Sequence, residues 1–284
     1  MLRRAILVLA ATAGLFSIVP VTSSFGRNPD IGGFQLTSTG GMPSVTRVAV
    51  ASAARAASLF ATPSVISAPT IDLGVFGSVA ISAARLPAAE KWQHVSQVDF
   101  RAMFGPDCAS SGLAGCNTRF ANTLRSVAGQ ADGLAEVAML NLVNRSVNGA
   151  MKYREDTALW GVGDYWATPS EIARKGAGDC EDFAIAKFWL LRSLGVPADQ
   201  LQLVVLQDTR RQLFHAVLVA HMAGGSYVLD NVTSRLSLDT AYGQYQPIMS
   251  FSAGRNYIHG FSGSNTAMAA MPKDLSSVSP GEGL

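Results

Sequence analysis

The chain has 284 residues, a formal net charge of +2, 48% hydrophobic residues and 15% charged residues. This composition is that of a globular protein with enough apolar residues for one well-buried domain. The sequence has no Lys/Arg-rich run and no basic stripe with interleaved aromatic residues, which argues against a nucleic acid as partner.

Residues 1–25 have the features of an export signal. A short cationic region, Met1–Arg4, precedes an apolar run over residues 5–20 that is short and rich in small residues for a membrane span. We expect a signal peptide. An uncleaved anchor is the alternative, because no clean small-x-small cleavage site stands near Ser23–Phe25. Both interpretations predict a periplasmic or secreted protein.

Residues 26–87 consist largely of Ala, Ser, Thr, Val, Gly and Pro and are predicted to be a poorly ordered extension. They are more apolar than most disordered segments, so short strands such as Thr70–Ile81 docking on the domain remain an alternative. Residues 88–262 mix charged residues with aromatic and apolar ones, as expected of a compact domain. Residues 263–284, rich in Ser, Gly and Pro, are predicted to form a flexible tail.

The chain has three cysteines. In an oxidising compartment Cys108 and Cys116, which enclose a Gly- and Ser-rich segment, can form a disulfide that fixes a loop. Cys180 is then unpaired, which in an exported protein indicates either a reactive thiol or an intermolecular disulfide.

Two helices are predicted in the domain, one over Leu134–Val147 and one that begins at Cys180 and ends before Gly195-Val196-Pro197. Gly178 provides flexible backbone just upstream of Cys180, and Asp179 a capping side chain. The thiol is therefore expected in the first turn, where the positive end of the helix dipole favours the thiolate.

Three strands follow, at Leu201–Leu206, Leu213–Ala220 and Tyr227–Leu229, and the turns between them are short enough for antiparallel hairpins. His215 lies near the start of the second strand and Asp230 at the end of the third. In adjacent antiparallel strands these positions are neighbours, so the carboxylate can orient the imidazole if the two side chains share a face.

Four motifs now stand in series along the chain: DYWATPSE at 164–171, GDCEDFA at 178–184, HAVL at 215–218 and VLDN at 228–231. Together they resemble the bacterial transglutaminase-like cysteine peptidases over roughly Trp92 to His259. The resemblance implies an α+β fold with a papain-like core, in which N-terminal helices carry the nucleophile at a helix N-terminus packed on an antiparallel sheet.

The resemblance also implies roles for residues. Cys180 would be the nucleophile, His215 the general base and acid, and Asp230 the orienting carboxylate. The best-understood branch of the family consists of periplasmic, calcium-dependent proteases that clip large surface adhesins, and a membrane receptor that senses a cyclic dinucleotide restrains them. A protein substrate and an inner-membrane regulatory receptor are thus the expected partners.

Calcium has a separate physical argument, because Asp179, Glu181 and Asp182 place three carboxylates around a thiol that must ionise. A hard cation held by carboxylate oxygens would relieve this repulsion and stiffen the loop. The resemblance points to the same acidic residues as ligands, with Asp179 and Glu181 first. The alternative is that these acids only cap the helix.

Simpler interpretations accompany these. Cys180 could be an inert buried cysteine, His215 a hydrogen-bonded strand residue and Asp230 a turn residue. His94, His221 and His259 are expected on the surface or in packing. Trp166 is expected in the core, with an oxyanion role as a guess. The backbone N–H of Cys180 is the preferred oxyanion donor.

Three functions follow from the sequence. The first is an exported cysteine endopeptidase, which we favour. The second is a protein acyl transferase with the same three residues, in which an amine replaces water as the acyl acceptor. The third is a catalytically silent binding protein.

Overall fold

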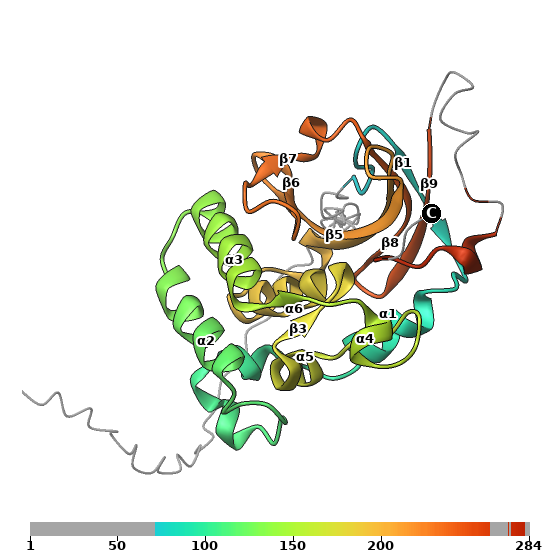
Figure 1. Cartoon of the computed structure of the whole chain (residues 1–284). Coiled ribbons are helices and arrows are strands. Elements are labelled where there is room, and N and C mark those ends of the chain that lie inside the picture. The colour runs from blue at the N-terminus through green and yellow to red at the C-terminus, as the bar shows by residue number, and fades with distance from the viewer. Residues whose placement is uncertain (1–71, 262–271, 273, 282–284) are drawn as a thin grey trace, which may run out of the picture. The chain divides into compact units, whose positions relative to one another are not determined.

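The computed structural model describes residues 72–261, 272 and 274–281 (Figure 1). The expected export signal, residues 26–71 of the extension, and residues 263–271, 273 and 282–284 of the tail lie outside the described residues. The fold is α+β, as the sequence predicts, with helices packed against an antiparallel sheet. No helix in the described part of the chain is long and apolar enough to cross a membrane.

The main sheet has seven strands in the order β1-β9-β8-β4-β5-β6-β7, and every pair is antiparallel. Its strands are β1 (Val79–Ala83), β4 (Leu201–Asp208), β5 (Leu213–Met222), β6 (Gly225–Leu229), β7 (Ser237–Leu238), β8 (Tyr245–Ser252) and β9 (Arg255–Gly260). A small parallel pair consists of β2 (Lys152–Tyr153) and β3 (Ala177–Gly178).

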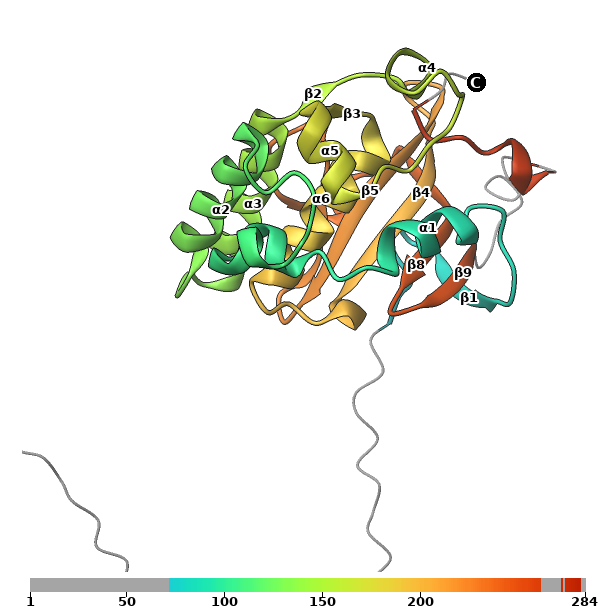
Figure 2. The ribbon, with the colours of Figure 1, turned by 90° about the horizontal axis from the view of Figure 1, so that it is seen from below.

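The helices gather on one face of this sheet, as Figures 1 and 2 show. They are α1 (Ala89–Ser96), α2 (Arg119–Ala131), α3 (Glu136–Ala150), α4 (Asp156–Leu159), α5 (Pro169–Lys175) and α6 (Cys180–Ser193). The expected disulfide joins Cys108 and Cys116, whose Cα atoms are 5.6 Å apart, in the segment before α2.

Helix α6 is the centre of the helical layer. Its residues are buried from Cys180 to Leu191, because it packs on β4 and β5 on one side and on α2, α3 and α5 on the others. The helix ends where the sequence predicts: Gly195 has a φ of 89°, and the Val196 N–H bonds to the Leu191 carbonyl.

The strand alternation of the central sheet supports two apolar clusters, one on each face. In β4, Leu203 and Val205 pack on the helices, whereas Val204 and Leu206 belong to a second cluster on the opposite face. Successive side chains of a strand point to opposite faces, so both faces of β4 are buried. The predicted hairpins are confirmed, with Leu206 paired to His215 and Leu218 to Leu229.

Strand β8 contains an irregularity beside the centre of the sheet. Val205 of β4 pairs with Met249, but the next residue, Leu206, pairs with Pro247, so Ile248 is an extra residue. A bulge of this kind changes which face the following side chains reach. Met249 packs on the helices, while Tyr245 joins the second cluster.

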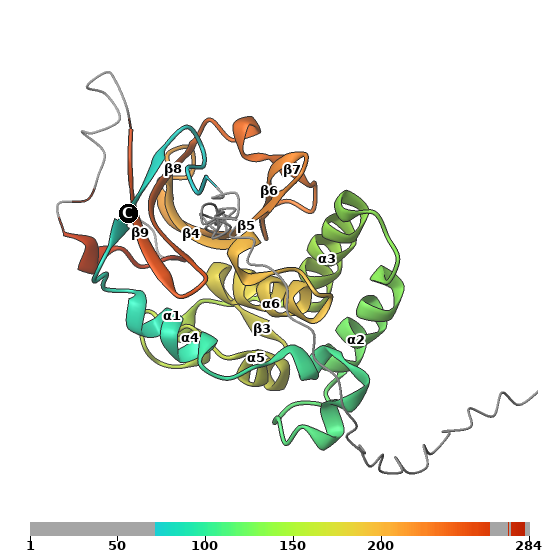
Figure 3. The same ribbon diagram turned by 180° about the vertical axis from the view of Figure 1, so that it is seen from behind.

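Strand β1 comes from the stretch that the sequence assigned to the extension, and it answers the question left open there. Val79 to Ala83 pair with β9, from Gly260 to Asn256, so a short strand of this stretch does dock on the sheet (Figure 3). Upstream of it, Val75 is 1% exposed and packs in the second apolar cluster.

Candidate active site

Cys180 is the first residue of α6, and its side chain is 2% exposed. The thiol donates a hydrogen bond to Glu181 Oε2 at 3.3 Å and accepts one from the backbone N–H of Ala216 on β5. Because Ala216 follows His215 directly, the packing of α6 on β5 brings the thiol beside the residue next to the predicted base.

His215 and Asp230 are in contact, with 3.0 Å between His215 Nε2 and Asp230 Oδ1, and both are buried. Strand parity explains why their faces agree. His215 alternates with Val217, and Asp230 with Val228, and both valines lie in the second apolar cluster.

The carboxylate of Asp230 has two more donors. Tyr245 Oη donates to Oδ2 at 2.6 Å and the Val232 N–H donates to Oδ1 at 2.9 Å. Burial alone would raise the pKa of Asp230, but the hydrogen bonds from His215, Tyr245 and Val232 hold it at about 2. An ionised Asp230 requires the proton on Nε2 of a neutral His215, which leaves Nδ1 as the acceptor nitrogen.

Tyr245 was not found by sequence analysis. It follows Asp230 by 15 residues and reaches the carboxylate from β8, and the bulge at Ile248 sets its side of the sheet. No local pattern around Tyr245 marks it, because its role depends on the register between two strands.

Beside the thiol lies a group of three buried carboxylates, Asp156, Asp179 and Glu181, whose nearest oxygens are all within 4.8 Å of one another. Burial raises the pKa of Asp179 to about 8 and raises that of Glu181 well above its ordinary value, with the charge of Asp179 as the next cause for Glu181. One oxygen of each, Asp179 Oδ1 and Glu181 Oε1, is buried with no hydrogen-bond partner among the described residues.

Asp156 is the member of this group that the sequence did not identify, and Asp182 is the expected ligand that lies elsewhere. Asp182 Oδ1 accepts the Ala167 N–H at 2.8 Å, and its carboxylate also accepts the Asp179 N–H. A Cβ on Gly178 would lie 2.5 Å from Asp182 Cβ, so this turn needs a glycine.

Two expectations about the nucleophile need correction. Asp179 occupies the N-cap position of α6, but its side chain makes no capping hydrogen bond. Burial raises the pKa of the Cys180 thiol above its ordinary value, and the charge of Asp179 raises it further, against the lowering effect of the Ala216 N–H. The helix N-terminus therefore does not outweigh burial and the charge of Asp179 at this thiol.

Of the remaining residues named from the sequence, Trp166, His221 and His259 are buried and His94 is exposed. Trp166 is 2% exposed and contacts Phe251 edge-on in the core. His221 bonds Ser226 and Gln202, and His259 bonds Ser78 and Ser250. His94 lies near Tyr165, with ring centres 6.4 Å apart.

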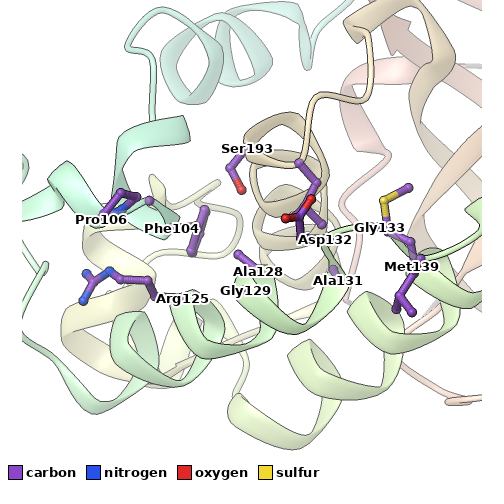
Figure 4. Close-up of a pocket in the computed structure, with 13 residues that line it drawn as sticks. Phe104, Pro106, Arg125, Ala128, Gly129, Ala131, Asp132, Gly133, Met139 and Ser193 are labelled. Atoms are coloured by element: carbon purple, nitrogen blue, oxygen red, sulfur yellow. The ribbon is translucent and has the colours of Figure 1, made fainter. Parts of the chain in front are cut away.

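A pocket of about 610 Å³ lies away from these residues, at the far end of α6 (Figure 4). Phe104, Arg125, Asp132 and Ser193 are among its lining residues. Ser193 is 13 residues after Cys180, which along a helix is about 20 Å. This pocket is not part of the site around the thiol.

Comparison with known proteins gives a family and several similar structures. The model of a family described as bacterial transglutaminase-like cysteine proteinase matches residues 114–255. A structure of Legionella pneumophila LapG has a TM-score of 0.47 and 25% identity, over 57% of this chain and 88% of that chain. The structure of its EGTA-treated form has a TM-score of 0.47 and 24% identity, over 61% of this chain and 96% of that chain. The structure of its calcium-bound form has a TM-score of 0.43 and 27% identity, over 64% of this chain and 94% of that chain. Comparison with curated proteins gives no match.

Proposed function

The chain belongs to the bacterial transglutaminase-like cysteine proteinases, and from this we propose that it is an exported endopeptidase that cuts a protein substrate with Cys180, His215 and Asp230. The observation that carries the proposal is the arrangement of these residues. The only free cysteine of the chain lies against the N–H of Ala216, and the preceding residue, His215, is bonded to an ionised Asp230.

In the proposed reaction His215 Nδ1 takes the thiol proton as the sulfur of Cys180 attacks a peptide carbonyl. The imidazolium, held by Asp230 through Nε2, then gives the proton to the leaving amine, and the acyl group remains on the sulfur as a thioester. Water, deprotonated by the same imidazole, hydrolyses the thioester. The Cys180 N–H is proposed to stabilise the oxyanion, because the first N–H groups of a helix have no intrahelical partner.

Calcium is the proposed cofactor, and the residues present fit it. Asp156, Asp179 and Glu181 offer hard oxygen ligands within 4.8 Å of one another, and two of their buried oxygens have no hydrogen-bond partner among the described residues. A bound cation would neutralise the carboxylates on both sides of Cys180 and fix the turn before α6. Asp182, which contacts Ala167 instead, is not proposed as a ligand.

The proposed location is the periplasm or the cell exterior. The disulfide between Cys108 and Cys116 supports this, because disulfides persist in oxidising compartments. A large surface adhesin as substrate, and an inner-membrane receptor as regulator, are proposed from the family resemblance.

The test is the comparison of new protein N-termini in the envelope fraction of cells that express the wild-type protein or Cys180→Ser. We expect at least one N-terminus that appears only with the wild type and is lost again with His215→Ala. Incorporation of an added primary amine at the new C-terminus, in place of hydrolysis, would indicate the acyl transferase. Identical N-terminal profiles for all three proteins would contradict the peptidase.

A further inference from the structure

Residues 278–281 return to the domain and dock beside the candidate active site. After the short helix η6 (Leu275–Ser277), Val278 is 5% exposed and belongs to the apolar cluster under the helices, and Pro280 is also buried. A segment that only lay loosely on the surface would not bury its apolar side chains, so this contact is specific.

The segment approaches residues on both sides of the site. The Gly281 N–H donates to the Phe214 carbonyl at 3.1 Å, and Phe214 precedes His215. A Cβ on Gly281 would lie 2.9 Å from Asp179 Oδ2, and Asp179 precedes Cys180. Gly281 has a φ of 87°, which also favours glycine at this position.

The contact with Phe214 is on the same strand edge as the thiol. Of the residues of β5, only Leu218–Met222 pair with β6. Phe214 and Ala216 therefore lie beyond the part of β5 that β6 covers. Backbone groups two residues apart in a strand point to the same side. The Ala216 N–H binds the Cys180 sulfur and the Phe214 carbonyl binds Gly281, so the two contacts lie on one edge of β5, on either side of residue 215.

A protein substrate has to present its backbone along this edge for a carbonyl to reach Cys180. Peptides commonly bind an uncovered strand edge through main-chain hydrogen bonds, with pockets for alternate side chains. Residues 278–281 make one such main-chain bond, from the Gly281 N–H, and bury the side chain of Val278. The 2% exposure of Cys180 accords with an approach that is already occupied.

We propose that residues 278–281 bind in cis at the β5 edge where a substrate binds, so that the chain carries its own competitive inhibitor. The inference rests on the proposed function, because it assumes a protein substrate, and on the contacts of Gly281 and Val278, which attach the segment to the domain. Displacement of the segment is then the step that opens the site.

The test uses the full-length protein and the rate of Cys180 alkylation by iodoacetamide, followed by mass. The signal is specific because the other two cysteines form a disulfide. Val278→Asp places a charge in the apolar anchor, and Ser277→Asp, at the exposed neighbouring position, is the matched control. We expect Val278→Asp to react at least 10-fold faster than the wild type, and Ser277→Asp to react at the wild-type rate.

A second arm guards against effects of the substitution on folding. Deletion of residues 278–284 is expected to give the same acceleration with a cooperative thermal transition. A synthetic peptide of residues 274–284 should slow the reaction again, and the same peptide with Gly281→Val should not. Wild-type alkylation rates in the folded deletion protein would overturn the proposal.

The readout does not depend on turnover, which separates the two proposals. Faster alkylation without any new N-terminus in the envelope fraction would contradict the proposed peptidase activity and support the docking of the segment. New N-termini together with an alkylation rate that is the same with and without residues 278–281 would contradict the inhibitor and support the peptidase.

Discussion

At the scale of single residues, polar groups outside the proposed catalytic residues organise the site. Asp230 is held by Tyr245 as well as by His215, and Asp156 completes the carboxylate group beside the thiol. Each of these contacts can be tested by a substitution that removes one hydrogen-bonding or charged group and changes the side-chain volume little.

Tyr245→Phe removes the phenol that donates to Asp230 Oδ2 at 2.6 Å. Hydrogen bonds to charged groups are worth about 1.5–3 kcal/mol, so we expect the cleavage rate to fall by about 10-fold or more as His215 is held less firmly. Tyr242→Phe is the control, since Tyr242 stacks on Tyr245 while its own phenol hydrogen-bonds Ser237. Equal rates for the two variants would show that the phenol does not support the imidazole.

Asp156→Asn is expected to weaken calcium binding by about 10-fold or more, because it removes one of three carboxylates that lie together. Glu155→Gln changes the same charge at an exposed neighbouring position and should bind as the wild type does. Titration calorimetry measures the affinity, and the change in melting temperature on adding EGTA provides a second reading. An Asp156→Asn protein that binds calcium normally would remove this residue from the ligand set.

At the scale of elements, the sequence predicts what local patterns encode. Helix α6 and strands β4 to β6 were found because a glycine-proline stop and apolar alternation are local signals. These elements place Cys180 against Ala216, the neighbour of His215, and His215 against Asp230. Asp156 lies in a four-residue helix, and Tyr245 is the first residue of β8, in which the bulge at Ile248 breaks the alternation. Neither segment has a periodicity that would identify it, and the contribution of each depends on long-range packing.

Helix α6 also carries a buried Lys187, whose Nζ donates to the Leu229 carbonyl at 3.4 Å. Burial lowers the pKa of Lys187 to about 7 from 10.5, although the charge of Asp230 opposes this. Between these pH values the unfolded chain binds a proton that the folded chain does not, so the free energy of unfolding should rise with pH across this window.

Lys187→Met is expected to remove this rise and to increase the free energy of unfolding at pH 7 by roughly 1–4 kcal/mol, since it replaces a buried cation by an apolar side chain. Urea unfolding at several pH values between 7 and 10 measures both effects. Lys152→Met, at an exposed position, should keep the wild-type dependence. A slope that survives in Lys187→Met would mean that another group causes it.

At the scale of the whole domain, segments from both sides of the four sequence motifs are attached to one sheet. Strand β1 pairs with β9 at one edge, and residues 278–281 bind the edge of β5. Ser78 Oγ bonds His259 Nδ1 at 2.7 Å, so the stretch before Ala88 contributes to the buried polar contacts of the sheet as well.

A chain that starts at residue 84 should therefore be less stable than one that starts at residue 72. The shorter chain lacks β1 and the buried Val75, and we expect a loss of about 3 kcal/mol in the free energy of unfolding. Denaturant unfolding of the two proteins compares them directly. The same midpoint for both would show that β1 is attached without stabilising the sheet.

The extra residue in β8 gives the site a dependence on chain length that no side chain reveals. Because Ile248 shifts the alternation of β8, Tyr245 faces Asp230 rather than the helices. With this bulge kept, removing Gln246 would shift the alternation between the bulge and Tyr245 by one residue and turn the phenol to the opposite side, with every residue of the site still present. A homologue could thus lose this support by a one-residue deletion and keep an intact set of motifs, so spacing within β8 is as informative about activity as the identity of its residues.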